Sequence, residues 1–131
     1  NVPYPYTIND AKLWLKKTQE DNYSFNIFLK NKLIGGISIT NKKNTTKPEL
    51  GYWIGEDFWG KGYAHESCIN LKHYFFSNTS HNIIYASHMK GNIKSKKILM
   101  NIGFKFVRTG QIFSISRNEI VDNLDYELIK S

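Results

Sequence analysis

Cysteine is almost absent from this sequence, and long apolar runs are missing altogether. Cys68 is the one cysteine among 131 residues, so no disulfide can form within the chain and a reducing compartment, the cytoplasm, is expected. No stretch approaches the roughly 18 to 20 apolar residues of a membrane-spanning helix, and the first residues lack the basic-then-apolar order of a secretory signal. We therefore predict a cytoplasmic protein with no membrane association.

The sequence also lacks the residue spacings of common metal and phosphate sites. Its four histidines are scattered, with no H-x-x-x-H or C-x-x-C spacing, so we predict no metal. The phosphate-loop pattern G-x-x-x-x-G-K-[ST] does not occur. We expect His88 to be exposed at a strand end, and Cys68 to lie in the core rather than to act as a nucleophile.

Negative charge is in short supply. The 18 basic and 11 acidic residues give a formal net charge of +7, which suits nucleic acid, acidic proteins or phosphate-bearing ligands without choosing among them. Because lysine and asparagine are abundant along the whole chain, we attribute much of this charge to overall composition and do not expect nucleic-acid binding. The length and the 40% hydrophobic content predict a single globular domain over residues 1–131.

Apolar periodicity predicts an N-terminal helix and then three strands. A hydroxyl followed three residues later by a carboxylate marks a helix start, and we expect a helix over residues 9–18 that buries Ala11, Trp14 and Leu15. Alternation of apolar and polar residues then predicts three strands, of which the first two form a hairpin: residues 25–29, 33–40 and 49–54.

A strand between two helices predicts a parallel pair at the centre of the sheet. Helices are expected over residues 64–76 and 92–101, the second ended by Gly103, with a strand over residues 83–87 between them. Such a strand-helix-strand connection makes its two strands parallel. Three more strands are expected near residues 104–108, 111–116 and 124–129. The predicted fold class is α/β (α+β), with a mixed, mostly antiparallel sheet and flanking helices.

A glycine-rich turn over residues 58–64 joins a predicted strand to a helix. Gly60 and Gly62 let the backbone approach a ligand, and the first amides of the helix have no partner within it. The helix dipole adds about half a positive charge there, so the turn suits a pyrophosphate. The third glycine of a dinucleotide fingerprint is missing, which argues against nicotinamide chemistry. A turn that needs its glycines for geometry alone is the alternative interpretation.

These residues resemble the GNAT superfamily of acetyltransferases. The family's cofactor motif, Q/R-x-x-G-x-G/A, is similar to residues 59–64, with Trp59 in place of the usual Gln or Arg. Further segments resemble the branch that contains the ribosomal-protein N-terminal acetyltransferases RimJ and RimL: residues 49–54, Glu66, residues 92–95 and residues 102–104. The resemblance runs from Pro5 to Tyr126. It implies the acyl-CoA N-acyltransferase fold, in which a central parallel strand pair splays apart to admit a thioester.

The resemblance further implies that acetyl-CoA is the cosubstrate and is held chiefly by main-chain atoms. The turn amides would bind the pyrophosphate, the strand edge at residues 52–54 would pair with the pantetheine arm, and Asn92 would hydrogen-bond that arm. The cofactor-binding residues expected on this basis are Tyr52, Trp53, Ile54, Trp59, Gly60, Lys61, Gly62, Tyr63, Ala64, Asn92 and Ser95. Simple helix capping by Asn92, with Ser95 exposed, is the alternative.

Acetyl transfer to an amine needs a group that takes a proton from the attacking nitrogen and a group that stabilises the departing thiolate. Glu49, at the entry to its strand, is the candidate base, directly or through a water; a solvated acid at a strand edge is the alternative. The resemblance puts Ser95 close to the sulfur, where it would donate a hydrogen bond. Leu99 stands where some relatives have an acid tyrosine.

Relatives usually carry a strand and a helix ahead of the part that resembles residues 5–7, so the domain is expected to be short at its N-terminus. The strand over residues 25–29 would then be an exposed edge, and dimerisation or strand complementation is our hypothesis. A protein N-terminal amine is the favoured acceptor, with a polyamine or aminoglycoside-like amine second. A catalytically inactive acyl-CoA-binding module and a nucleic-acid binder are alternatives from other classes.

Overall fold

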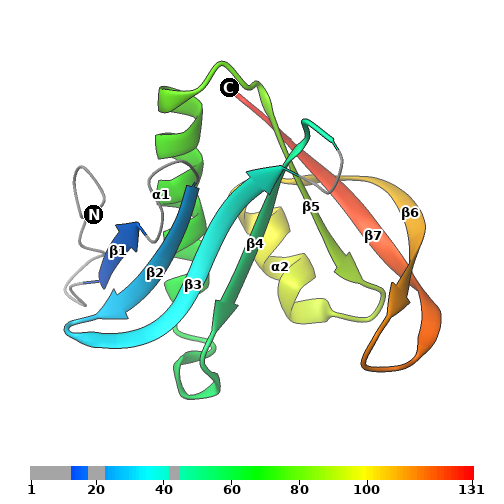
Figure 1. Cartoon of the computed structure of the whole chain (residues 1–131), viewed down its shortest axis with the longest axis horizontal. Helices are drawn as coiled ribbons and strands as arrows, with labels where there is room; N and C mark the ends of the chain where they lie inside the picture. Colours follow the sequence, from blue (N-terminus) through cyan, green and yellow to red (C-terminus); the bar gives the residue numbers. More distant parts are fainter. Residues whose placement is uncertain (1–12, 18–22, 42–44) are drawn as a thin grey trace.

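The computed structural model describes residues 13–17, 23–41 and 45–131, in which a seven-stranded sheet carries two α-helices (Figure 1). The strands are β1 (Leu13–Lys17), β2 (Tyr23–Leu29), β3 (Lys32–Asn41), β4 (Pro48–Ile54), β5 (Ile83–Met89), β6 (Lys105–Ser114) and β7 (Glu119–Ile129). The helices are α1 (Tyr63–Asn78) and α2 (Ile93–Ile102), and a short 3-10 helix, η2 (Glu56–Phe58), precedes α1. The predicted mixed architecture is confirmed.

The strands of the sheet lie in the order β1-β2-β3-β4-β5-β7-β6. Within the described residues every neighbouring pair is antiparallel except β4 and β5, which are parallel and share a single residue pair, Glu49 with Tyr85. In Figure 1 these two strands lie together near the top of the view and diverge downward. The splayed parallel pair predicted for the centre of the sheet is therefore present.

Both helices cover the same face of the sheet, behind it in Figure 1, and they contact each other. α1 buries Cys68, Leu71 and Phe75 at the predicted helical spacing. Alternate residues of the strands complete this core, and they include Phe25, Ile37, Ile39, Leu50, Ile84 and Leu128. Each buried side chain of this size contributes about 1.5–3 kcal/mol relative to an exposed one. The core thus fixes which face of β4 and β5 meets the helices.

α2 ends where the sequence predicts. Leu99 and Ile102 are buried, and Gly103 has a φ of 117°, which is the left-handed conformation that glycine adopts without strain. Its amide donates to the carbonyl of Leu99 at 3.2 Å. The helix therefore stops against the core and turns the chain into β6.

The predicted helix over residues 9–18 is wrong in its described part, because residues 13–17 form strand β1. This strand pairs with β2 in antiparallel register, with Leu13 opposite Leu29 and Leu15 opposite Ile27. Leu13 and Leu15 are both buried, which is the period of two that a strand requires. The rest of the predicted helix lies outside the described residues.

The position of β1 also removes the basis of the dimerisation hypothesis. β2 is not an edge of the sheet, since β1 covers it, and the two edges within the described residues are β1 and β6. An unpaired row of backbone amides and carbonyls on β2 was the reason to expect a second chain there. That reason does not hold for this structure.

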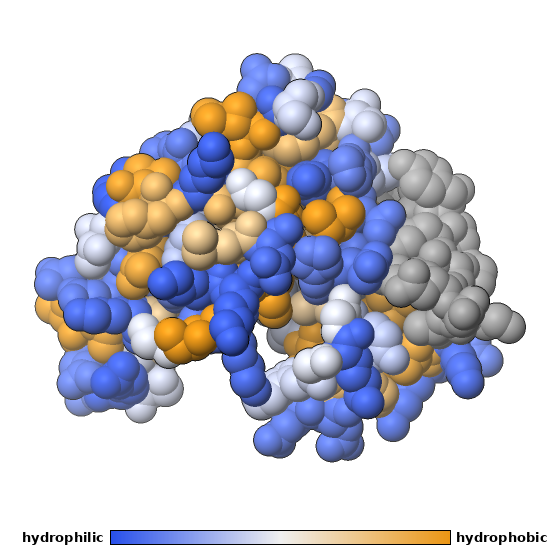
Figure 2. All heavy atoms as spheres, turned by 180° about the vertical axis from the view of Figure 1, so that it is seen from behind, coloured by the Kyte–Doolittle hydropathy of each residue, from blue (hydrophilic) through white to orange (hydrophobic). Residues whose placement is uncertain are grey.

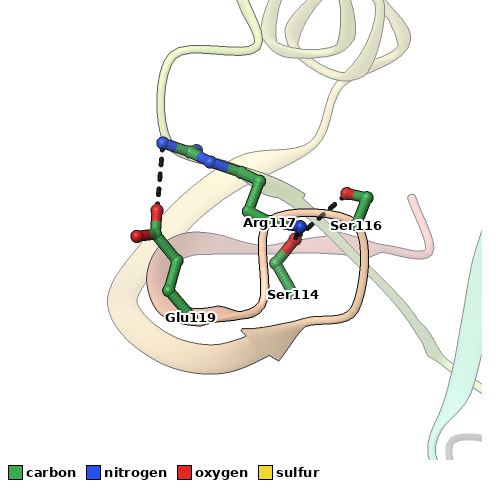
Figure 3. Close-up of polar contacts among 4 residues, drawn as sticks. All are labelled: Ser114, Ser116, Arg117 and Glu119. Atoms are coloured by element: carbon green, nitrogen blue, oxygen red, sulfur yellow. Dashed lines mark hydrogen bonds and ion pairs between the residues drawn. The ribbon is translucent and has the colours of Figure 1, made fainter.

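One long strand, β6, replaces the two that were predicted near residues 104–108 and 111–116. β6 continues through Gly110, where an added Cβ would lie 3.1 Å from Oδ1 of Asn123, and it pairs with β7 along its length. The chain reverses only at residues 115–118, shown in Figure 3. There the Ser114 hydroxyl accepts from the amide of Arg117 at 3.3 Å, and the Arg117 guanidinium pairs with Glu119 at 3.2 Å (Figure 3).

Candidate active site

The turn after β4 has an open, left-handed backbone at both of its predicted glycines. Gly60 and Gly62 have φ values of 74° and 83°, and a Cβ added at either would meet nothing within 4 Å. A non-glycine residue in this conformation costs roughly 1–2 kcal/mol. The glycines are thus needed for the backbone path, and that path leaves their surface accessible to a ligand.

The start of α1 offers free backbone donors beside these glycines. Gly62 is the N-cap and provides no side-chain cap, and the first bond of the helix runs from the Glu66 amide to the Gly62 carbonyl at 3.0 Å. In the part of the chain that the structure describes, the amides of Tyr63, Ala64 and His65 have no hydrogen-bond partner. Amides in this state, with the positive end of the helix dipole, form a site for an anion such as a phosphate group.

The side chains around the turn point in different directions. Trp59 is half exposed, and its indole Nε1 donates to the carbonyl of Ile54 at 2.7 Å. Trp53 is exposed on the face of β4 opposite to Ile54, where its ring lies over Gly36. Ile54 packs against the core. The side chains of the residues predicted along this strand edge therefore do not converge on one site, and only the main-chain atoms of these residues can act together.

A slot begins where β4 and β5 separate. Tyr52, from β4, and Ser95, from α2, meet on the helix side of this slot, where the Tyr52 hydroxyl donates to the Ser95 Oγ across a long 3.4 Å. Figure 2, which views the helix side, shows an indentation at the lower edge of the molecule, beside the lobe of the turn. The hydroxyl of Ser95 is half buried rather than fully exposed, in the region where a thioester sulfur is expected.

The Tyr52 hydroxyl is a group that sequence reasoning missed. Burial raises its pKa above the ordinary tyrosine value, an effect that the Ser95 bond partly offsets and the nearby Cys68 slightly increases. Tyr52 therefore keeps its proton at neutral pH and can donate it to a hydrogen bond. The alternation of β4 was the available signal, because Tyr52 shares the face of buried Leu50.

Asn92 caps α2, as the alternative interpretation proposed. Its side-chain Oδ1 accepts from the backbone amide of Ser95 at 3.1 Å, and its backbone amide donates to the carbonyl of Met89 at 3.1 Å. The cap fixes the first turn of α2 and so places Ser95 beside Tyr52. Contact of the Asn92 side chain with a pantetheine arm stays a prediction.

Glu49 does not come together with Ser95. Strand alternation places Glu49 on the sheet face away from the helices, whereas Tyr52 faces them. Glu49 is half buried at the closed end of the slot, opposite Tyr85. The two candidate catalytic groups therefore lie on the two sides of the splayed strands.

A hollow of about 400 Å³ lies on the side of Glu49 rather than on the helix side. Gly51 leaves its floor open, and the Trp53 ring, which covers Gly36, forms a wall. Its polar lining consists of Ser24, Asn26 and Ser38. No charged side chain of the described residues lines this hollow, so it suits an uncharged polar chain better than a polycation.

The expectation that His88 is exposed is wrong. The imidazole is 8% exposed, with Nδ1 2.8 Å from the carbonyl of Met89 and Nε2 2.8 Å from the Tyr126 hydroxyl. Because a carbonyl only accepts, Nδ1 carries the proton and Nε2 accepts from Tyr126. Cys68 is buried as predicted, and burial raises the pKa of its thiol.

Two further observations concern ions and membranes. In residues 13–17, 23–41 and 45–131, no three histidine, cysteine, aspartate or glutamate side chains gather where they could hold a metal ion. Neither helix in those ranges is long and apolar enough to cross a membrane.

Comparison of the sequence with known protein families agrees with this geometry of a splayed parallel pair and a glycine turn at its open end. Residues 1–105 match the family model described as acetyltransferase (GNAT) domain. The chain belongs to this family. It is 27% identical over 125 residues to "Uncharacterized N-acetyltransferase p20" of Bacillus licheniformis, which covers 94% of this chain and 68% of that protein. It is 37% identical over 73 residues to "Putative ribosomal N-acetyltransferase YdaF" of Bacillus subtilis (strain 168), which covers 55% of this chain and 40% of that protein.

Solved structures share the fold. A "Probable acetyltransferase" superposes with a TM-score of 0.74 at 29% identity, over 82% of this chain and 61% of that one. The ribosomal-protein acetyltransferase RimL in complex with coenzyme A superposes with a TM-score of 0.70 at 19% identity, over 82% of this chain and 61% of that one. The microcin self-immunity acetyltransferase MccE with acetyl-CoA and AMP superposes with a TM-score of 0.72 at 21% identity, over 81% of this chain and 59% of that one. The GNAT fold is therefore confirmed, and this chain spans about three fifths of each of these structures.

Proposed function

We propose that this chain is an acetyltransferase that transfers an acetyl group from acetyl-CoA directly to a primary amine, in particular to the N-terminal amine of a protein. The observation that carries the proposal is the pairing of two features in one family member. These are the free amides at the start of α1, beside the Gly60–Gly62 turn, and the slot lined by Tyr52 and Ser95. We further propose that residues 1–131 act as one domain in the cytoplasm, where a single buried thiol is stable.

The residues of the turn fit the phosphates of acetyl-CoA. The amides from Lys61 to His65 and the positive end of α1 would bind the diphosphate, and the open glycine surface lets it come close. The edge of β4 beyond Glu49 is left without a β5 partner by the splay, so its backbone groups would pair with the amide groups of the pantetheine arm. When bound, acetyl-CoA supplies the activated acyl group.

The chain's own residues would divide the proton chemistry between the two sides of the slot. Glu49 would take a proton from the attacking nitrogen, directly or through a water, as the nitrogen forms its bond to the carbonyl carbon. Ser95, on the opposite side, would donate a hydrogen bond to the sulfur as the carbon–sulfur bond breaks. Tyr52 would orient the Ser95 hydroxyl by donating to its Oγ. Buried Cys68 takes no part, so no acyl-cysteine forms.

The acceptor proposal rests on three supports. The name of YdaF and the likeness to RimL both point to ribosomal proteins. The hollow on the Glu49 side has an uncharged polar lining, which would admit an extended peptide. The likeness to MccE is the reason to keep a small-molecule amine as the second candidate.

The test is thiol release from acetyl-CoA with a panel of acceptors, followed by mass spectrometry of the products. The panel contains peptides with serine or alanine at the N-terminus, the same peptides with a blocked N-terminus, a polyamine and an aminoglycoside. We expect release only with free N-termini. Tight acetyl-CoA binding without turnover on any acceptor would instead support an inactive acyl-CoA-binding module, and absence of binding would refute both.

A further inference from the structure

Trp59 and Lys94 meet across the open end of the slot. Trp59 belongs to the turn after β4, whereas Lys94 lies in the first turn of α2, after β5. The Lys94 Nζ lies 4.0 Å from the centre of the Trp59 ring. A cation within about 6 Å of an indole face is attracted by the ring electrons. The contact therefore joins the two sides of the slot at the end where the glycine turn begins.

The ring under the ammonium group is held in place. Its Nε1 donates to the Ile54 carbonyl at 2.7 Å, and the Trp59 backbone amide donates to the Glu56 carbonyl at 3.2 Å. A rotation of the indole away from the turn would break the first of these bonds. The indole is thus held in place beneath the Lys94 ammonium group, and the backbone of the same residue leads directly into Gly60 of the turn.

The Lys94 charge is available to a ligand. In the described residues no carboxylate forms an ion pair with Lys94, and its side chain is exposed. An ammonium group has three N–H donors, and contact with one ring face leaves donors free. A phosphate group at the turn would receive hydrogen bonds from main-chain amides on one side, so a cation on the other side completes its coordination.

We propose that Lys94 is a phosphate-binding residue whose ammonium group, positioned by Trp59, binds the diphosphate of a CoA thioester held at the Gly60–Gly62 turn. This inference rests on the proposed function and names a side chain for a task so far given to backbone atoms. Lys94 is adjacent to Ser95, so the first turn of α2 would contact both the phosphate end and the sulfur end of the same ligand. The site would then favour intact CoA thioesters over shorter ones.

The test compares Lys94→Gln with Lys96→Gln, an exposed lysine on the other side of the same helix. Calorimetry would measure binding of acetyl-CoA, of its form without the 3′-phosphate, and of acetyl-pantetheine, which has no phosphate. For Lys94→Gln we expect about a fivefold higher Kd for the two diphosphate ligands at low salt and no change for acetyl-pantetheine. The loss should shrink as salt rises. Lys96→Gln should bind all three ligands as the wild type does.

Each other outcome overturns the inference in a distinct way. Equal acetyl-CoA affinity of the two lysine variants would mean that Lys94 does not contact the ligand. If the loss of affinity disappears for the ligand without the 3′-phosphate, Lys94 binds the 3′-phosphate and not the diphosphate. A loss that includes acetyl-pantetheine would mean that Lys94 only holds α2 against the turn. Failure of the wild type to bind acetyl-CoA would refute the proposed function itself, which separates the two claims.

The positioning role of Trp59 has its own test, a double-mutant cycle with Trp59→Leu and Lys94→Gln. If the ring positions the ammonium group, Trp59→Leu alone should weaken binding and reduce its salt dependence, and adding Lys94→Gln should change little more. Fully additive losses would overturn this role. Circular dichroism of each variant, compared with the wild type, checks that the fold is intact.

Discussion

Replacement of Gly62 by alanine tests whether the turn binds a ligand or serves only the backbone path. The added Cβ meets no protein atom within 4 Å, so the stability cost should be the left-handed backbone alone, roughly 1–2 kcal/mol. The methyl group would, however, stand on the surface that a phosphate must approach. Loss of one charge-assisted hydrogen bond there would cost about 1.5–3 kcal/mol, which is at least about a tenfold rise in Kd for acetyl-CoA.

The matched control is Gly103→Ala, which also puts a non-glycine residue into a left-handed backbone conformation, here at the C-terminal end of α2. Gly103 has a φ of 117°, and its added Cβ would lie 3.2 Å from a methyl group of Leu128. Gly103→Ala should therefore destabilise the protein at least as much as Gly62→Ala in urea denaturation, yet leave the Kd for acetyl-CoA unchanged by calorimetry. Equal effects of the two variants on Kd would refute the assignment of the turn, because destabilisation alone would then explain the loss.

Four further outcomes are expected. Glu49→Gln should lower kcat about a hundredfold or more with little change in acetyl-CoA affinity, and an unchanged kcat in a coupled thiol assay would remove it as the base. Tyr52→Phe should lower kcat severalfold without raising the KM for acetyl-CoA, whereas a rise in KM alone would mean that the Ser95 bond serves binding. Leu13→Ala should cost about 2–5 kcal/mol in urea denaturation if residues 13–17 form a strand, and a negligible loss would favour the helix instead. The raised thiol pKa of Cys68 predicts that stability falls above about pH 8.5, where the unfolded thiol ionises but the native one does not; Cys68→Ala should lose this part of the pH dependence, and a wild-type curve identical to that of the variant would contradict it.

Local signals were sufficient for most of the elements. The β2–β3 hairpin follows from alternation of apolar and polar residues, and α1 follows from Cys68, Leu71 and Phe75 at helical spacing. Gly62 and Gly103 mark the start of one helix and the end of the other, because both require a positive φ. These features depend on neighbours within a few residues, so the sequence by itself determines them.

The errors arose where a distant partner decides the local structure. Leu13, Trp14 and Leu15 are consecutive apolar residues, a pattern that suits a helix or a strand equally, and pairing with β2 decides for the strand. β6 was predicted as two strands, near residues 104–108 and 111–116, yet the long ladder with β7 carries one strand through Gly110. A strand's length is set by its partner as well as by its own residues.

The chemistry of the candidate site divides in the same way. The order of its parts, a strand, a glycine turn, a helix and an Asn-x-x-Ser helix start, is written in the sequence because each part is a local backbone conformation. The pairing of Tyr52 with Ser95, 43 residues apart, and the separation of Glu49 from both depend on how β4 splays from β5. Side chains that meet across a sheet are brought together only by tertiary packing, so the structure alone shows which groups share a side of the slot.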